Sequence, residues 1–210
     1  MEVLFTGRFT GFPREAFTFF KNLATHNNRD WFQAHKDVYE RACRAPMQSL
    51  MAELAPRFGS GKLSRINRDM RFARGQSPYK THIAAGVGRH YISLSKEGLY
   101  IGTGIYKPEA AMLQRLRAAI DEESSGRKLG SLVASLRRKR YQIGTHETLA
   151  KPPRGYAADH PRIDLLRMKD IHAGKQFAPS ALSTRKALDR IAGVMADVEP
   201  LSAWLRQHVG

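Results

Sequence analysis

Residues 66–82 contain the densest group of side chains in this chain that could bind an anion. The segment reads Ile-Asn-Arg-Asp-Met-Arg-Phe-Ala-Arg-Gly-Gln-Ser-Pro-Tyr-Lys-Thr-His. Guanidinium, ammonium and hydroxyl groups hold phosphate or carboxylate through charge-assisted hydrogen bonds. We therefore expect a pocket for an anionic small molecule, in which Asp69 orients an arginine. Its candidate ligand-binding residues are Arg68, Asp69, Arg71, Arg74, Ser77, Tyr79, Lys80, Arg29 and Trp31.

A structural role for the same arginines is the alternative interpretation. They could pair with Asp69, Asp30 or Glu40 and fasten the loop to neighbouring helices. If residues 66–72 form a strand, its alternation places Asn67, Asp69 and Arg71 together on one face. The following stretch 75–78 must turn, because Pro78 lacks a backbone donor and disfavours a helix before it.

Two further motifs each allow a structural and a functional interpretation. Gly102 and Gly104 share a strand face with Tyr100 and Tyr106, which indicates that a helix, or a ligand stacked on the tyrosines, packs closely there. The run Arg-Arg-Lys-Arg at 137–140 closes a predicted helix. Cations at a helix C-terminus are stabilised by the helix dipole, and the same run could contact nucleic acid.

Metal, cofactor and nucleophile signals are weak in this sequence. Its eight histidines and one cysteine include no H-x-x-x-H or C-x-x-C spacing, so we expect no metal site and no cofactor. Walker A, nucleophile-elbow and kinase signatures do not occur. Cys43, the single cysteine, is best interpreted as a buried, inert thiol. Catalytic residues, and whether the protein is an enzyme, are not assigned by the sequence.

Hydrophobic periodicity predicts that the strands are grouped between two sets of helices. Three helices precede a group of strands, and further helices follow. The expected helices cover 13–23, 27–42, 46–58, 108–120, 129–136 and 188–198, the last ending at Pro200. The expected strands cover 66–72, 82–87, 91–95, 99–106, 141–144 and a stretch near 171. This order predicts an α+β protein, an antiparallel sheet with helices packed mainly on one face, in a single domain over 1–210.

Composition narrows the choice of compartment and partner. The sequence has no apolar run of about 18 residues that could span a bilayer, and its N-terminus does not resemble an export signal. With a single cysteine, we expect a cytoplasmic protein that does not associate with membranes. Its 35 Lys and Arg against 19 Asp and Glu give a net charge of +16. This charge favours anionic partners, either a small molecule or nucleic acid bound by a basic surface.

Several separated motifs, in order along the chain, resemble one family. They are Asn27-Asn28-Arg29-Asp30-Trp31-Phe32, Arg68-Asp69-Met70-Arg71-Phe72, Ser77-Pro78-Tyr79-Lys80-Thr81, Gly102-Thr103-Gly104-Ile105-Tyr106, Pro153-Arg154-Gly155-Tyr156 and His160-Pro161. Together they resemble the conserved hypothetical family called domain of unknown function 2461, over nearly the whole chain. The resemblance implies a single domain and no particular activity. Where that family commonly has an acidic residue and a lysine before Ser-Pro-Tyr-Lys, this chain has Gly75 and Gln76, which argues against transferring acid–base chemistry to it.

Overall fold

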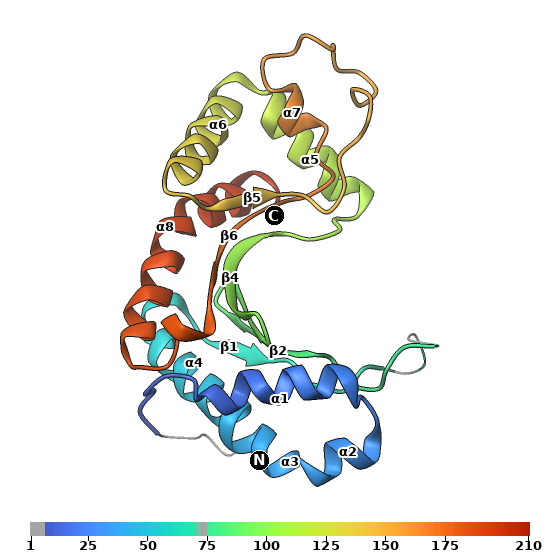
Figure 1. Ribbon diagram of the computed structural model, residues 1–210. Coiled ribbons are helices and arrows are strands. Elements are labelled where there is room, and N and C mark those ends of the chain that lie inside the picture. Colours follow the sequence, from blue (N-terminus) through green and yellow to red (C-terminus); the bar gives the residue numbers. More distant parts are fainter. Residues whose placement is uncertain (1–6, 70, 72–74) are drawn as a thin grey trace. The chain divides into compact units, whose positions relative to one another are not determined.

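A computed structural model describes residues 7–69, 71 and 75–210 and has an α+β fold, as predicted (Figure 1). Its strands form one six-stranded antiparallel sheet with the order β1-β2-β3-β4-β6-β5. The strands are β1 Gly61–Leu63, β2 His82–Val87, β3 His90–Ser95, β4 Gly98–Ile105, β5 Gln142–Gly144 and β6 Ile171–Phe177. The hairpin predicted over 91–106 is confirmed as β3 and β4, with β4 ending at Ile105.

The chain divides into two compact units. The first unit contains residues up to 101 together with 176–193, and the second contains 102–175 and 194–210. The boundaries fall inside β4, β6 and the last helix. One domain over residues 1–210 stays a prediction. Within the described residues, no helix is long and apolar enough to cross a membrane.

Two helices of the first unit, α1 Arg14–Thr25 and α4 Ala45–Phe58, begin and end within two residues of the predicted bounds. This unit also contains α2 Arg29–Ala34, α3 Lys36–Val38, a π-helix η1 Tyr39–Arg44 and a 3-10 turn η2 Pro179–Ala181. Asn28 caps α2 by accepting a hydrogen bond from the Trp31 N–H at 2.9 Å. Gly59, with φ of 96°, ends α4. Helix α1 packs against β3, and α4 packs against β1 and β2.

The single helix predicted over 27–42 is wrong, because the helix is interrupted at His35. The His35 ring Nδ1 lies 2.8 Å from the Trp31 carbonyl oxygen, which is the acceptor that the His35 N–H would use in a continuous α-helix. The His35 N–H bonds the Phe32 carbonyl instead, at 3.2 Å. The His35 side chain thus competes with its own backbone N–H for the Trp31 carbonyl at the point where α2 ends and α3 begins.

The helices of the second unit are α5 Ala110–Asp121, α6 Glu123–Arg138, α7 Ile163–Leu166 and the end of α8 Lys186–His208. Pro200 does not end the last helix, which corrects the sequence prediction. Proline removes one backbone hydrogen bond. Leu201, Trp204 and Leu205 continue the buried stripe of the helix beyond it. We infer that burial of these side chains outweighs the lost bond.

Candidate functional site

The described residues of 66–81 belong to no helix or strand, which corrects the strand predicted over 66–72. Among its described residues, a single antiparallel bridge joins Asn67 to Tyr79. Two backbone hydrogen bonds flank that bridge, from the Arg68 N–H to the Pro78 oxygen at 2.8 Å and from the Lys80 N–H to the Ile66 oxygen at 2.9 Å. Residues 66–68 and 78–80 are therefore held side by side by these hydrogen bonds. Met70, Phe72 and Arg74 lie outside the described residues.

Asn27 holds this loop against the helices. Its side-chain Nδ2 donates to the Tyr79 oxygen at 2.9 Å, and its Oδ1 accepts from the Tyr79 N–H at 3.0 Å. The Asn27 amide thus bonds the N–H and the carbonyl of Tyr79, the two groups that would otherwise be free to pair with a further strand. The Tyr79 ring is 4% exposed and stacks on Phe32 with their centroids 4.1 Å apart. Tyr79 is thus placed in the core of the first unit, although it was predicted to bind ligand.

Replacing Asn27 by alanine should lower the free energy of unfolding by about 1–2 kcal/mol, because both backbone groups of Tyr79 lose their partners. Amide hydrogen exchange at Tyr79 should become faster by a matching factor. Asn28→Ala is the control: it removes the cap of α2, costing about 1 kcal/mol, without touching Tyr79. Unchanged exchange at Tyr79 in Asn27→Ala would show that the loop is held by other contacts.

Arg71 and Asp69 neutralise one another. The Arg71 Nε donates to Asp69 Oδ1 at 2.9 Å, and its Nη2 donates to Oδ2 at 2.6 Å. The guanidinium, together with the Arg71 N–H, lowers the pKa of the Asp69 carboxyl. Both side chains are exposed, so the pair contributes little to stability. This geometry agrees with the structural interpretation for Arg71 and leaves the charges of Arg68 and Lys80 to be accounted for.

Arg68, Lys80 and His82 form a cationic cluster at the base of the loop. The Arg68 Nη1 donates to the Gln76 Oε1 at 3.0 Å, and the Lys80 Nζ donates to the Arg65 carbonyl at 3.0 Å. Both acceptors are neutral. Throughout residues 7–69, 71 and 75–210, no carboxylate lies within ion-pair distance of either cation. The Arg68 Nε is buried and has no hydrogen-bond partner there.

Burial and the positive charges of Lys80 and Arg68 affect the pKa of His82. Burial, followed by the charges of Lys80 and Arg68, lowers the pKa of His82 below its usual value of 6.5. Its neutral form therefore dominates at neutral pH. The charges of Arg68 and Lys80 thus each disfavour protonation of His82, and an anion bound beside these two cations would oppose that effect.

The other predicted binding residues are exposed or contact residues outside the cationic cluster. Ser77 and Arg29 are exposed. Trp31 stacks on His35 with ring centroids 4.1 Å apart and also contacts Phe19. Glu40, a predicted alternative partner for the loop arginines, pairs with Arg44 instead.

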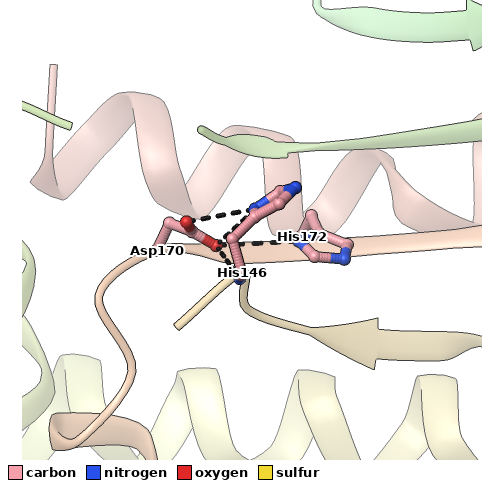
Figure 2. A group of neighbouring side chains, drawn as sticks. All are labelled: His146, Asp170 and His172. Carbon is pink, nitrogen blue, oxygen red and sulfur yellow. Dashed lines mark hydrogen bonds and ion pairs between the residues drawn. The ribbon is translucent and has the colours of Figure 1, made fainter. Parts of the chain in front are cut away.

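A second group of functional side chains lies in the second unit (Figure 2). His146 follows β5, Asp170 precedes β6, and His172 lies within β6. The His146 ring Nδ1 lies 3.1 Å from Asp170 Oδ2, and the His172 Nδ1 lies 3.7 Å from Asp170 Oδ1. Both rings thus turn Nδ1 toward one carboxylate, as Figure 2 shows. We call these residues the His–Asp–His cluster.

The surrounding backbone fixes the carboxylate of this cluster. Asp170 is 2% exposed, and its Oδ1 accepts from the His146 N–H at 3.0 Å. Burial raises the pKa of Asp170, but hydrogen bonds from the His146 backbone and ring outweigh this effect and lower it overall. Burial and the charge of His146 lower the pKa of His172. An ionised carboxylate therefore lies beside a neutral imidazole at neutral pH.

Gly104 and Gly144 lie so close to His172 that a side chain at either position would crowd it. A Cβ on Gly104 would lie 2.6 Å from the Cα and Cβ of His172, and one on Gly144 would lie 3.0 Å from its Nε2. The close neighbour of Gly104 in the Gly-Thr-Gly motif is therefore strand β6. The sequence analysis missed this cluster. Its one local signal is the Asp170-Ile171-His172 spacing, and His146 joins only through the pairing of β5 with β6.

Comparison with known proteins adds a family and no activity. No curated protein matches the chain. A family model described as "Conserved hypothetical protein (DUF2461)" matches residues 15–204. This match covers most of the chain and includes the loop, the cationic cluster and the His–Asp–His cluster. The chain therefore belongs to this family of conserved hypothetical proteins, as the sequence motifs indicated.

Proposed function

We propose that the first unit binds an anionic small molecule, bearing phosphate or carboxylate, at the cationic cluster. The observation that carries the proposal is that, among the residues that the structure describes, Arg68 and Lys80 donate to neutral acceptors and pair with no carboxylate. Partly buried charges usually have a partner of opposite sign. A bound anion would supply that partner, and would also favour the protonated form of His82.

The hydrogen bonds that Arg68 and Lys80 now make are at exposed positions, so a ligand can reach both cations from solvent. An anion with two oxygens could replace the Gln76 amide at the Arg68 guanidinium and accept a further bond from Lys80. The net charge of +16 would raise the rate at which such a ligand arrives. Arg71 is not required, because Asp69 already neutralises it.

Inorganic phosphate and pyrophosphate test the proposal by calorimetry and by thermal unfolding. We expect both anions to bind, pyrophosphate more tightly. Arg68→Met and Lys80→Met should each weaken binding by about 10–100-fold, the loss typical of one charge-assisted hydrogen bond. Lys62→Met is the matched control, because Lys62 is an exposed cation of the same unit on β1. Absence of binding, or equal loss in the control, would reject the cluster as the site.

Nucleic acid is the alternative partner, and the same variants separate it from a small anion. A basic surface that binds DNA uses many cations, so Lys62→Met should then weaken binding as much as Lys80→Met does. Affinity should also fall steeply with rising salt.

We further propose a cytoplasmic location, because Cys43 is buried and unpaired, which suits a reducing compartment.

A further inference from the structure

We propose that His146, Asp170 and His172 bind one divalent transition-metal ion of the zinc class. This site lies in the second unit and does not depend on the anion site of the first. Two imidazoles and a carboxylate are ligands suited to Zn²⁺, Co²⁺ or Fe²⁺, and less suited to Ca²⁺ or Mg²⁺, which prefer oxygen ligands. Three protein ligands leave at least one coordination position for water or another ligand.

The spacing of the ligand atoms fits a single ion. One ligand atom from each residue lies within 4.8 Å of the other two. Ligands bound at about 2.0–2.1 Å in a tetrahedral site lie roughly 3.4 Å from one another. The separations of 3.1 Å between His146 Nδ1 and Asp170 Oδ2, and 3.7 Å between His172 Nδ1 and Asp170 Oδ1, bracket this value. Small side-chain rotations would therefore suffice.

The His172 Nδ1 supplies an independent observation. It is buried and has no hydrogen-bond partner among the described residues, and its 3.7 Å separation from Asp170 is too long for a hydrogen bond. A buried polar atom without a partner is costly. An ion between His172 and Asp170 would satisfy that nitrogen and would also neutralise a carboxylate that is 2% exposed.

The site is held in place before any ion binds and is open on one side. Asp170 is fixed by the His146 N–H, and its own N–H donates to Thr145 Oγ1 at 3.3 Å. The His146 side chain is 46% exposed, so an ion and an exchangeable ligand can reach it. Glu147 pairs with Lys169 and is therefore not an available fourth ligand in this arrangement. These features favour an accessible site over a closed structural one.

Metal binding can be measured on the full chain after chelator treatment and removal of any histidine tag. We expect one Zn²⁺ per chain by calorimetry, a rise in the unfolding temperature with Zn²⁺, and a visible absorption band with Co²⁺. His146→Ala should weaken Zn²⁺ binding by at least about 100-fold, because loss of an outer-shell partner alone costs about 10–100-fold. The exposure of His146 favours retention of the fold in this variant.

His160→Ala is the matched control. His160 Nε2 lies 3.2 Å from Asp121 Oδ1, so it forms a histidine–aspartate pair in the same unit, and neither residue belongs to a three-ligand group among the described residues. Zn²⁺ affinity should be unchanged in this variant and reduced in both His146→Ala and His172→Ala. The proposal is overturned if the unmodified chain binds neither Zn²⁺ nor Co²⁺, if His146→Ala binds as tightly, or if His160→Ala loses as much affinity.

Discussion

Replacing Gly126 by alanine should lower the free energy of unfolding by about 2–4 kcal/mol, although alanine is the better helix former by about 1 kcal/mol. Gly126 lies inside α6. A Cβ there would meet the Ile120 carbonyl oxygen and would lie 2.6 Å from the Arg162 Nε. A backbone carbonyl cannot move away as a flexible side chain can. The added methyl group should therefore separate α6 from the end of α5.

The same methyl group would displace a side chain that caps α5. The Arg162 Nε donates to the Ile120 carbonyl at 2.7 Å, and its Nη2 donates to the Asp121 carbonyl at 2.9 Å. Its Nη1 also pairs with Glu123 at the start of α6. Carbonyls in the last turn of a helix have no partner within the helix, so Arg162 satisfies groups that would otherwise remain unpaired.

Gly130→Ala provides the matched control on the same helix. A Cβ at Gly130 would meet nothing within 4 Å. This variant should therefore gain about 0.5–1 kcal/mol from helix propensity and from the reduced freedom of the unfolded chain. Denaturant unfolding of both variants measures the contrast. If Gly126→Ala were as stable as Gly130→Ala, the close approach of α5 and Arg162 to α6 would be wrong.

Sequence reasoning was successful where a local signal determines the structure. Pro13, the Asn28 cap and Gly59 each stand next to the observed end of a helix, and alternation over 91–106 identifies a hairpin. The errors have tertiary causes. The His35 ring contacts the Trp31 carbonyl, and the Asn27 amide hydrogen-bonds the backbone of Tyr79. Helix α8 continues beyond Pro200 because the side chains that follow are buried. None of these contacts can be read from hydrophobic periodicity.

In the candidate sites, too, local sequence signals identified some features and missed those that depend on tertiary contacts. Composition and spacing identified the loop as rich in cations, but the separation of Arg71, which is neutralised, from Arg68 and Lys80, which are not, depends on side-chain geometry. His146 and Asp170 meet only because β5 pairs with β6. Motif searches for metal sites rely on ligands close together in sequence, so they overlook ligands that a sheet brings together.

Replacing Glu53 by alanine should lower the free energy of unfolding by about 2–4 kcal/mol, because several groups in the first unit lose one shared acceptor. Glu53 Oε1 accepts from the Phe9 N–H at 2.6 Å and from the Arg185 Nη1 at 2.9 Å, and Oε2 accepts from the Arg185 Nη2 at 2.6 Å. Arg185 also donates to the Phe9 carbonyl at 2.8 Å. The carboxylate thus joins α4 to two segments distant in sequence.

Glu15→Ala separates the effect of this network from that of an ordinary ion pair. Glu15 also accepts two hydrogen bonds from one guanidinium, at 2.8 and 2.9 Å from Arg41. The Glu15 side chain, however, is 42% exposed and bonds no backbone group, whereas Glu53 is 24% exposed. Exposed pairs contribute little to stability, so Glu15→Ala should cost clearly less than Glu53→Ala. Equal losses in the two variants would mean that the Phe9 contact adds nothing.

The dependence on pH provides a further check of the Glu53 network. The hydrogen bonds from Arg185, with a further one from the Phe9 N–H, lower the pKa of Glu53 below its usual value of 4.5. A carboxyl group with a lowered pKa in the folded state stabilises fully above its unfolded pKa and loses this effect as the pH falls through the folded pKa. The stability difference between the unmodified protein and Glu53→Ala should therefore be constant from pH 7 to about 5 and shrink below pH 4.5. A difference that persists undiminished in acid would show that Glu53 acts through packing rather than through its charge.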